Sequence, residues 1–253
     1  MIENLIGDLD RVVALRGAKV ILTFNIAERA EPNLAPTNLD IQYIRNEHPK
    51  GFASNHNAAF EHCTSDLFLV LNPDVRLPVS GFEALLEPFA QAPDVGLVAP
   101  MVESSDGLRE DSLRTNLTPL SVATRRFASA DQRYLAGLRA TQAGRFFWVA
   151  GMFMLFRANA FAAVGGFDSR LHLYCEDYDI CARLWLGGWR IRPVDAYAIV
   201  HDAQRATGRS MRHLRWHVAS LLRTWLSLPF WTVSLRSLGA ARATPAARSP
   251  TGR

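Results

Sequence analysis

The chain has 253 residues, of which 49% are hydrophobic and 21% are charged, and its formal net charge is +4. This composition is ordinary for a soluble globular protein, and the length suits one domain or one domain with an appendage. No internal repeat, P-loop or Gly-x-Gly-x-x-Gly pattern occurs, which excludes repeat architectures and those two phosphate-binding loops.

Charge is unevenly placed along the chain. No Asp or Glu follows Asp202, whereas arginine recurs at Arg205, Arg209, Arg212, Arg215 and Arg223. A basic excess confined to the C-terminal end indicates an anionic partner there.

The three cysteines, Cys63, Cys175 and Cys181, form neither an even set nor a Cys-x-x-Cys pair. We therefore expect free thiols in a reducing compartment, a cytosolic protein, and no structural zinc site. The N-terminus mixes acidic and apolar residues, unlike a secretory signal peptide, and no apolar run reaches the length of a transmembrane helix.

The first predicted elements are a helix over residues 2–15 and strands over residues 20–24 and 41–44, from helical spacing followed by β-branched and apolar runs. Asn25 follows the first strand and Asn46 the second. Each could hydrogen-bond a ligand, and a turn-capping role for Asn25 is at least as plausible.

A helix is expected to open at Lys50-Gly51-Phe52 and to carry Asn57 in its second turn. Gly51 permits a close backbone approach, and a helix N-terminus offers free N–H groups to a diphosphate. Helix capping is the alternative for the asparagines at 55 and 57.

Residues 67–71 form a continuous apolar run, as expected for a strand covered on both faces. The run delivers Asn72-Pro73-Asp74 to the carboxyl end of the sheet, where ligands bind in such folds. Asp74 could hold Mg²⁺ or Mn²⁺ together with phosphate oxygens and water, or the tripeptide could be an ordinary turn.

A helix over residues 82–90 and a strand over residues 95–100 follow, and residues 103–143 are polar and rich in arginine. We expect a strand over residues 148–156, a helix over residues 180–187 and a strand over residues 191–200 that ends at His201. Three carboxylates, Glu176, Asp177 and Asp179, precede that helix in an otherwise apolar segment. Buried acids of this kind bind cations or handle protons, although a carboxylate at a helix start also favours the helix dipole.

At the C-terminal end, residues 211–230 predict a basic amphipathic helix, with Trp and Leu on one side and arginines elsewhere. It suits the surface of an anionic membrane, and packing against the main domain is the alternative. Residues 231–253 are rich in Ala, Arg, Ser, Pro and Gly and are expected to be a disordered tail.

Taken together, these segments resemble the family 2 glycosyltransferases of the GT-A fold, in particular their bacterial rhamnosyltransferase-like branch. The resemblance covers about residues 19–210 and rests on four motifs and one histidine: Asn72-Pro73-Asp74, Trp148-Val149-Ala150-Gly151, Gly165-Gly166-Phe167-Asp168, Glu176-Asp177-Tyr178-Asp179 and His201. It implies one α/β domain over residues 1–210, with a GT-A-like mixed, mainly parallel sheet and helices on both faces.

The resemblance also implies roles for individual residues. Asp177 is expected to be the catalytic base with Glu176 beside it, and Asp74 and His201 are expected to hold Mg²⁺ or Mn²⁺. The expected acceptor residues are Trp148, Gly151 and Glu176. The expected donor residues are Asn25, Asn46, Gly51, Phe52, Asn57, Asn72 and Asp74.

Several positions depart from the family pattern. The family opens with a strand that is not found ahead of the helix at residues 2–15, either because of a truncated or misplaced start or because the lineage lost it. Phe24 stands where the family usually has Asp, Pro49 where it often has Asn, and Asn55 where it often has Gly.

The expected function is inverting transfer of a sugar from a nucleotide-sugar to a hydroxyl of a cell-surface glycan or lipid-linked acceptor. The resembled branch of the family implies rhamnose as the sugar. The arginines at 109, 114, 125 and 126 could serve an anionic lipid-linked acceptor or form ordinary solvated surface. We expect a cytoplasmic protein, peripheral to the inner face of the membrane, with no nucleic-acid partner. The alternatives are a non-catalytic scaffold, which the missing strand and Phe24 favour, a nucleotidyltransferase, and a metal-dependent phosphoesterase.

Overall fold

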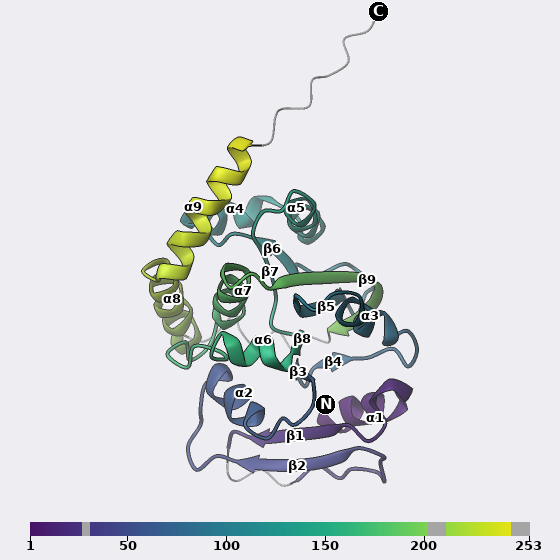
Figure 1. The fold of residues 1–253 in the computed structure, drawn as a ribbon. Coiled ribbons are helices and arrows are strands. Elements are labelled where there is room, and N and C mark those ends of the chain that lie inside the picture. Colours follow the sequence, from purple (N-terminus) through teal and green to yellow (C-terminus); the bar gives the residue numbers. More distant parts are fainter. Residues whose placement is uncertain (27–30, 202–210, 244–253) are drawn as a thin grey trace, which may run out of the picture.

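The computed structural model describes residues 1–26, 31–201 and 211–243 (Figure 1). Its strands are β1 (Lys19–Phe24), β2 (Asp40–Arg45), β3 (Leu67–Leu71), β4 (Val75–Arg76), β5 (Val95–Ser104), β6 (Leu113–Thr115), β7 (Phe147–Val149), β8 (Phe153–Arg157) and β9 (Arg190–His201). Its helices are α1 (Ile2–Arg11), α2 (Phe52–Phe60), α3 (Glu83–Gln91), α4 (Pro119–Thr124), α5 (Ala130–Gln142), α6 (Ala158–Ala163), α7 (Glu176–Leu186), α8 (Met211–Trp225) and α9 (Leu228–Ala243), with 3₁₀ turns at Val13–Leu15 and Arg125–Phe127.

The main sheet has five strands in the order β3-β8-β5-β9-β4. Strands β5 and β9 are parallel, and β8 pairs antiparallel with both β3 and β5, so β3, β5 and β9 run in one direction. Strand β4 pairs antiparallel with β9 at the edge. The expected mixed α/β architecture is confirmed, with most strands of this sheet running the same way.

Two smaller sheets accompany it. Strands β1 and β2 form a parallel pair, and β6 and β7 form an antiparallel pair. In Figure 1 the β1–β2 pair lies apart from the main sheet, at the foot of the view.

Helices cover both faces of the sheet, as predicted. Alternate residues of β8 point to different clusters, with Met154 and Phe156 in one and Phe153 and Leu155 in the other. The first cluster includes residues of α2, α6 and α7, and the second includes residues of α1 and α3. A period of two along a strand separates its side chains in this way, so the sheet is sandwiched between two apolar layers.

Two predictions around residues 148–187 were wrong in detail. The apolar run expected to be one strand is divided into β7 and β8 by a turn at residues 150–152, because the backbone N–H of Gly151 bonds to Asp177 instead of to a neighbouring strand. The following helix begins at Glu176 and not at Ile180. Its three acidic residues therefore belong to its first turn.

The C-terminal segment also differs from expectation. The disorder predicted from residue 231 is wrong up to Ala243, because α9 occupies this stretch and buries Phe230 and Val233 in the main core. Residues 244–253 lie outside the described part of the chain. Helix α8 stops at Trp225, so the single helix predicted for residues 211–230 is two helices. No helix among the described residues is long and apolar enough to cross a membrane.

Candidate functional site

The carboxylate of Asp177 is fixed by backbone donors in the first turn of α7. Its Oδ2 accepts a hydrogen bond from the N–H of Gly151 at 3.1 Å, and its Oδ1 accepts one from the N–H of Tyr178 at 2.8 Å. The approach to this turn is strained, since Tyr174 and Cys175 have φ values of 74° and 66°, a region that non-glycine residues rarely occupy. The backbone therefore holds the expected catalytic base in one orientation.

Glu176 and Asp177 form a pair that resists ionisation. Burial and the neighbouring charge of Asp177 raise the pKa of Glu176 to about 8. Burial also raises the pKa of Asp177, while Arg114 and the two backbone donors act in the opposite direction. The Oε2 atom of Glu176 is buried and has no hydrogen-bond partner in the described structure. At neutral pH the pair therefore shares a proton, as closely spaced buried carboxyl groups do.

Arg114 supplies the positive charge of this site, and its expected role as solvated surface is corrected here. Its guanidinium lies 4.8 Å from the ring centre of Trp148 and 3.2 Å from Asp111. Burial lowers the pKa of Arg114 and the charge of Asp111 raises it. Asp111 also pairs with Arg125 and Arg133, so this cluster carries a net positive charge beside α7.

Trp148 is a core residue with one side on a cavity. It is 3% exposed, its Nε1 donates to the carbonyl of Thr115, and its ring packs edge-on against Tyr178. A cavity of about 180 Å³ lies against it, and Arg114, Arg125 and Arg133 are among the lining residues. Core packing of Trp148 is observed, and the acceptor contact expected from the family resemblance stays a prediction.

Asp179 has a structural role. Its carboxylate pairs with Arg183 one helical turn later, at 2.6 Å, and Arg183 also donates to the carbonyl of Val164. The pair ties α7 to the end of α6. This agrees with the structural alternative left open for Asp179.

A second polar cluster confirms that Asp74 and His201 lie together. Their closest oxygen and nitrogen, Oδ2 and Nε2, are 3.4 Å apart, because residue 75 of β4 is paired in register with His201 of β9. The Nδ1 atom of His201 lies 2.9 Å from Glu110. The hydrogen bond from His201 lowers the pKa of Asp74, and in return Asp74 and Glu110 raise the pKa of His201.

These residues fit a divalent cation in part. Among the described residues the Oδ1 atom of Asp74 is buried and has no hydrogen-bond partner, which fits an oxygen that can bind a cation. Glu110 on the far nitrogen of His201 is the usual outer partner of a metal-binding histidine. However, no group of three or more His, Cys, Asp or Glu side chains in the described residues is arranged to hold a metal by itself. Further ligands would have to come from substrate or water.

The turn at residues 150–152 links the two clusters. Gly151 donates to Asp177, and the carbonyl of Met152, the next residue, accepts from the N–H of Asn72 at 3.0 Å. Asn72 stands two residues before Asp74. Asp177 and the acidic end of β3 are therefore attached to neighbouring residues of one turn.

Asn25 and Asn46 come together at the carboxyl ends of β1 and β2. The side chain of Asn46 donates to Asn25 at 3.0 Å and to Asn55 at 2.8 Å, and Asn25 accepts from and donates to the backbone of Lys50. The amides fix the loop that leads into α2. Donor binding by Asn25 and Asn46 stays a prediction.

At the start of α2 the structure assigns packing roles to three expected donor residues. A Cβ on Gly51 would lie 2.2 Å from the carbonyl oxygen of His172, so glycine is required for backbone contact within the protein. The N–H of Phe52 donates to that same carbonyl, and the ring of Phe52 lies close to Gly151. Asn57 exchanges two hydrogen bonds with the backbone of Phe167. Contact of any of these three with a donor stays a prediction.

The C-terminal helices brace the segment before α7, so packing against the main domain, the alternative left open for the predicted helix, is observed. Ser220 donates to the carbonyl of Leu173, and the rings of His213 and His217 on α8 pack on Tyr174. From α9, Ser234 accepts from Asn116, whose oxygen accepts from Tyr178. Few residues of α8 are fully buried in the described structure, namely Ser220, Leu221 and Thr224, so the sequence of this helix indicates its packing only weakly.

The model for the glycosyltransferase-like family 2 matches residues 16–219, which is most of the chain and includes all nine strands from β1 to β9 of the described structure. The protein belongs to this family. It is 29% identical to the N-acetylglucosaminyl-diphospho-decaprenol L-rhamnosyltransferase of Mycobacterium tuberculosis over 177 residues, 63% of this chain and 54% of that protein. It is also 44% identical to the rhamnosyltransferase WbbL of Escherichia coli K12 over 78 residues, 30% of this chain and 29% of that protein.

The resemblance of this family member to the rhamnosyltransferase-like branch is thereby confirmed. The chain spans about half the length, or less, of these relatives. Among solved structures it is similar to Staphylococcus aureus TarS (residues 1–349), with a TM-score of 0.54, 12% identity, and coverage of 94% of this chain and 74% of that one. At this identity the likeness concerns the fold alone, and it supports the GT-A assignment.

The protonation of Glu176 predicts a pH-dependent stability. The folded protein keeps a proton on Glu176, whereas the unfolded chain, with a carboxyl pKa of 4.5, releases it. The contribution of Glu176 to the free energy of unfolding therefore falls as pH rises from 4.5 to about 8. The free energy of unfolding falls by up to about 1.4 kcal/mol per pH unit through this residue. In urea unfolding between about pH 5 and pH 8, Glu176→Gln should lose stability less steeply than the unmodified protein.

Asp94→Asn is the matched control, because a hydrogen bond from Arg190 lowers the pKa of this exposed carboxyl and keeps its titration below that window. Equal slopes for Glu176→Gln and the unmodified protein would show that Glu176 is ionised in the folded state.

Proposed function

We propose that the protein transfers a sugar from a nucleotide-sugar to a hydroxyl of a glycan or lipid-linked acceptor, with inversion at the anomeric carbon. Rhamnose is the sugar we propose to test first. The observation that carries the proposal is the Asp177 carboxylate, held by two backbone N–H groups beside a residue, Arg114, that supports its negative form. Family membership and the rhamnosyltransferase relatives support the reaction class.

In the proposed reaction Asp177 takes the proton of the acceptor hydroxyl while that oxygen forms a bond to the anomeric carbon. The bond from this carbon to the nucleoside diphosphate breaks, and the electron pair leaves with the diphosphate. A raised pKa suits Asp177 for this work, because a base is most effective when its pKa approaches the operating pH. Fixed hydrogen bonds keep its orientation without reorganisation.

Glu176 has a supporting part in this proposal. A protonated carboxyl with a free oxygen can donate a hydrogen bond to an acceptor hydroxyl without adding a second negative charge beside Asp177. It thereby orients the acceptor while Asp177 stays the base.

We propose Asp74 and His201 as protein ligands of Mg²⁺ or Mn²⁺, with Glu110 orienting His201. Bound there, the ion would neutralise the charge that develops on the departing diphosphate. The lowered pKa of Asp74, caused first by its hydrogen bond from His201, keeps this carboxylate negative at neutral pH.

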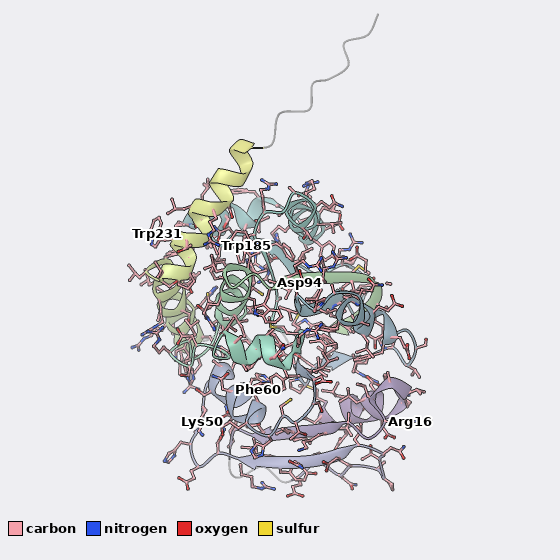
Figure 2. All side chains as sticks on the ribbon, viewed as in Figure 1. Arg16, Lys50, Phe60, Asp94, Trp185 and Trp231 are labelled. Carbon is pink, nitrogen blue, oxygen red and sulfur yellow. The ribbon has the colours of Figure 1, made fainter. Side chains whose placement is uncertain are left out.

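We also propose that the protein works at the inner face of the cytoplasmic membrane. Four apolar residues recur along one stripe of α8 and are each about half or more exposed: Met211, Leu214, Val218 and Leu222. Exposed Leu228, Trp231 and Leu235 continue the apolar surface on α9, and Figure 2 places Trp231 on the outer side of that helix. Arginines flank the stripe and no acid follows Asp202, which suits an anionic lipid surface.

Asp177→Asn should lower turnover by about 10² to 10⁴-fold, the range typical of a lost general base, with the fold unchanged. The measurement is release of nucleoside diphosphate from nucleotide-activated rhamnose in the presence of a prenyl-diphosphate-linked N-acetylglucosamine, with circular dichroism as the check on folding. Asp94→Asn, a change in an exposed ion pair with Arg190, is the control and should keep full activity. Undiminished turnover in Asp177→Asn would remove Asp177 from the mechanism, and no turnover in the unmodified protein would favour a non-catalytic scaffold.

Asp74→Ala should weaken Mn²⁺-dependent binding of a nucleoside diphosphate by tenfold or more, and Glu110→Gln should weaken it by about 10 to 100-fold through loss of the hydrogen bond to His201. Isothermal calorimetry with and without Mn²⁺ measures this independently of turnover. Asp66→Ala, an exposed acid just before the opposite end of β3, is the control. Equal affinity in the Asp74 and Asp66 variants would exclude Asp74 as a ligand.

Val218→Glu should reduce binding to phosphatidylglycerol vesicles by about tenfold, because it places an acid in the apolar stripe. The matched control is Val79→Glu, since Val79 and Val218 are 49% and 47% exposed but lie on different surfaces. Vesicle sedimentation at low and high salt measures the effect. Equal losses in the two variants would argue against α8 as the contact.

A further inference from the structure

The cavity of about 180 Å³ beside Trp148 is rich in positive charge, and we call it the arginine pocket. Arg114, Arg125 and Arg133 line it, and Asp111 is the one acid among its described lining residues. Three positive charges therefore face a single negative charge. The three arginine side chains are between 24% and 41% exposed, so a small anion can reach them from solution.

The arginines of the pocket keep hydrogen-bond donors available. Asp111 meets all three guanidinium groups with one atom, Oδ2, at 3.2, 2.5 and 2.9 Å. In the described structure Arg114 otherwise donates only from Nε to the carbonyl of Asp111, and Arg125 donates only to that Oδ2. A guanidinium has five N–H donors in a planar fork that matches the oxygens of a phosphate group. Arg114 and Arg125 can therefore bind a further anion.

The volume of the arginine pocket limits what it can hold. One water takes about 30 Å³ in the liquid, so the pocket has room for a group the size of about six waters, such as one or two phosphoryl groups. Pockets for drug-sized ligands have about 300–1,000 Å³, which is more than this cavity offers. The pocket thus suits a phosphate or a diphosphate and not a whole nucleotide.

The pocket is joined to the candidate catalytic site through β6 and β7. Arg114 of β6 is paired in register with Trp148 of β7, which places both side chains on one face of this two-stranded sheet. Strand β7 leads directly into the turn whose Gly151 donates to Asp177. Burial raises the pKa of Asp177 and the charge of Arg114 lowers it. A group bound in the arginine pocket is therefore held near the proposed base.

The two C-terminal helices, with their exposed apolar stripe, are attached beside the pocket. The carbonyl of Leu117, a lining residue, accepts a hydrogen bond from Trp225 of α8 at 2.8 Å. Asn116, the residue before it, donates to Ser234 of α9 (Figure 1). Helix α4 lines the pocket and carries Leu120, which is 72% exposed. An anion in the pocket can thus be joined to an apolar chain that lies on this surface.

We propose that the arginine pocket binds the diphosphate of a prenyl-linked acceptor, with Arg114, Arg125 and Arg133 as its cationic contacts. The prenyl chain would lie over Leu120 and the exposed stripe of α8, and the sugar next to the diphosphate would meet Asp177. This inference rests on the proposed function and specifies how the acceptor is recognised. The two diphosphates of the reaction then have separate sites, since that of the donor is proposed to lie at the cation.

Arg125→Gln tests the pocket with little disturbance of the fold, because the side chain of Arg125 makes one hydrogen bond in the described structure. Binding of farnesyl diphosphate is measured by calorimetry without metal or nucleotide-sugar. The affinity should fall by about 10 to 100-fold, as expected for the loss of charge-assisted hydrogen bonds. Arg190→Gln is the matched control and should keep full affinity, since Arg190 is 49% exposed and pairs with Asp94 at the same distance of 2.5 Å.

Thr124→Glu is a second variant, which adds an acid to the pocket lining and removes none of the arginine contacts. It should weaken binding of farnesyl diphosphate by about tenfold or more through like-charge repulsion. Thr64→Glu, at an exposed residue outside the pocket lining, is its control. Circular dichroism checks the fold of every variant.

Leu120→Gln separates the prenyl chain from the diphosphate. It should weaken binding of farnesyl diphosphate by about 3 to 10-fold, because apolar contact is lost, and leave the weaker binding of inorganic diphosphate unchanged.

Four outcomes would overturn the proposal. The first two are no binding of farnesyl diphosphate to the unmodified protein, and equal affinity in Arg125→Gln. Inorganic diphosphate that binds as tightly as farnesyl diphosphate would assign the pocket to a free anion. An equal loss of binding to phosphatidylglycerol vesicles in Arg125→Gln would assign it to bulk anionic lipid.

Failure of the proposed transferase activity gives a different result. Binding of farnesyl diphosphate that depends on Arg125, without turnover in the unmodified protein, would reject the reaction and keep the pocket. Turnover with an unchanged KM for the prenyl-linked acceptor in Arg125→Gln would reject the pocket and keep the reaction.

Discussion

The hydrogen bond from the N–H of Gly151 to Asp177 is the contact on which the candidate site depends. It interrupts an apolar run that would otherwise form one strand, and it fastens the first turn of α7 to the turn between β7 and β8. The same turn holds Asn72 through the carbonyl of Met152. A displacement of this turn would therefore move the proposed base and the acidic end of β3 together. The turn thus joins two motifs that lie about a hundred residues apart in the sequence.

The segment before α7 is costly to hold, because two consecutive non-glycine residues adopt a left-handed conformation there. Contacts from two elements compensate for that cost. Helix α8 contributes Ser220 and the rings that pack on Tyr174, and the start of α2 contributes the contact of Gly51 and Phe52 with His172. The C-terminal helices thus stabilise the site with one face, and the opposite face of α8 is left exposed for the proposed membrane contact.

Local patterns in the sequence predicted much of this architecture but not its long-range partners. The strands ending at Asn72 and His201 were evident from apolar runs, and the proximity of Asp74 to His201 followed from the family resemblance. Glu110 was missed, and Arg114 was named only among four arginines with two alternative roles, because the importance of both residues comes from tertiary placement in a stretch whose composition resembles solvated surface. The end of α9 was mistaken for disorder for a related reason, since Ala and Ser are compatible with helix once Phe230 and Val233 are buried. The strain at Tyr174 and Cys175 has no signature in residue type at all.

The pKa values of the two acidic clusters are shifted in opposite directions: the pKa of Asp74 is lowered, and those of Glu176 and Asp177 are raised. Asp74 accepts a hydrogen bond from His201 that lowers its pKa and favours its charged form, which suits a group that must stay negative to hold a cation. Glu176 and Asp177 are buried beside each other, which favours a shared proton and suits groups that must accept or donate one. In the proposed reaction a cation held at the first cluster would compensate the charge of the leaving diphosphate, and the second cluster would take the proton of the acceptor hydroxyl. The turn at residues 150–152 is bonded to Asp177 through Gly151 and to Asn72 through Met152, so it joins the two clusters. A side chain at Gly151 would meet Asp177 and Phe52, so glycine keeps the space beside the proposed base open.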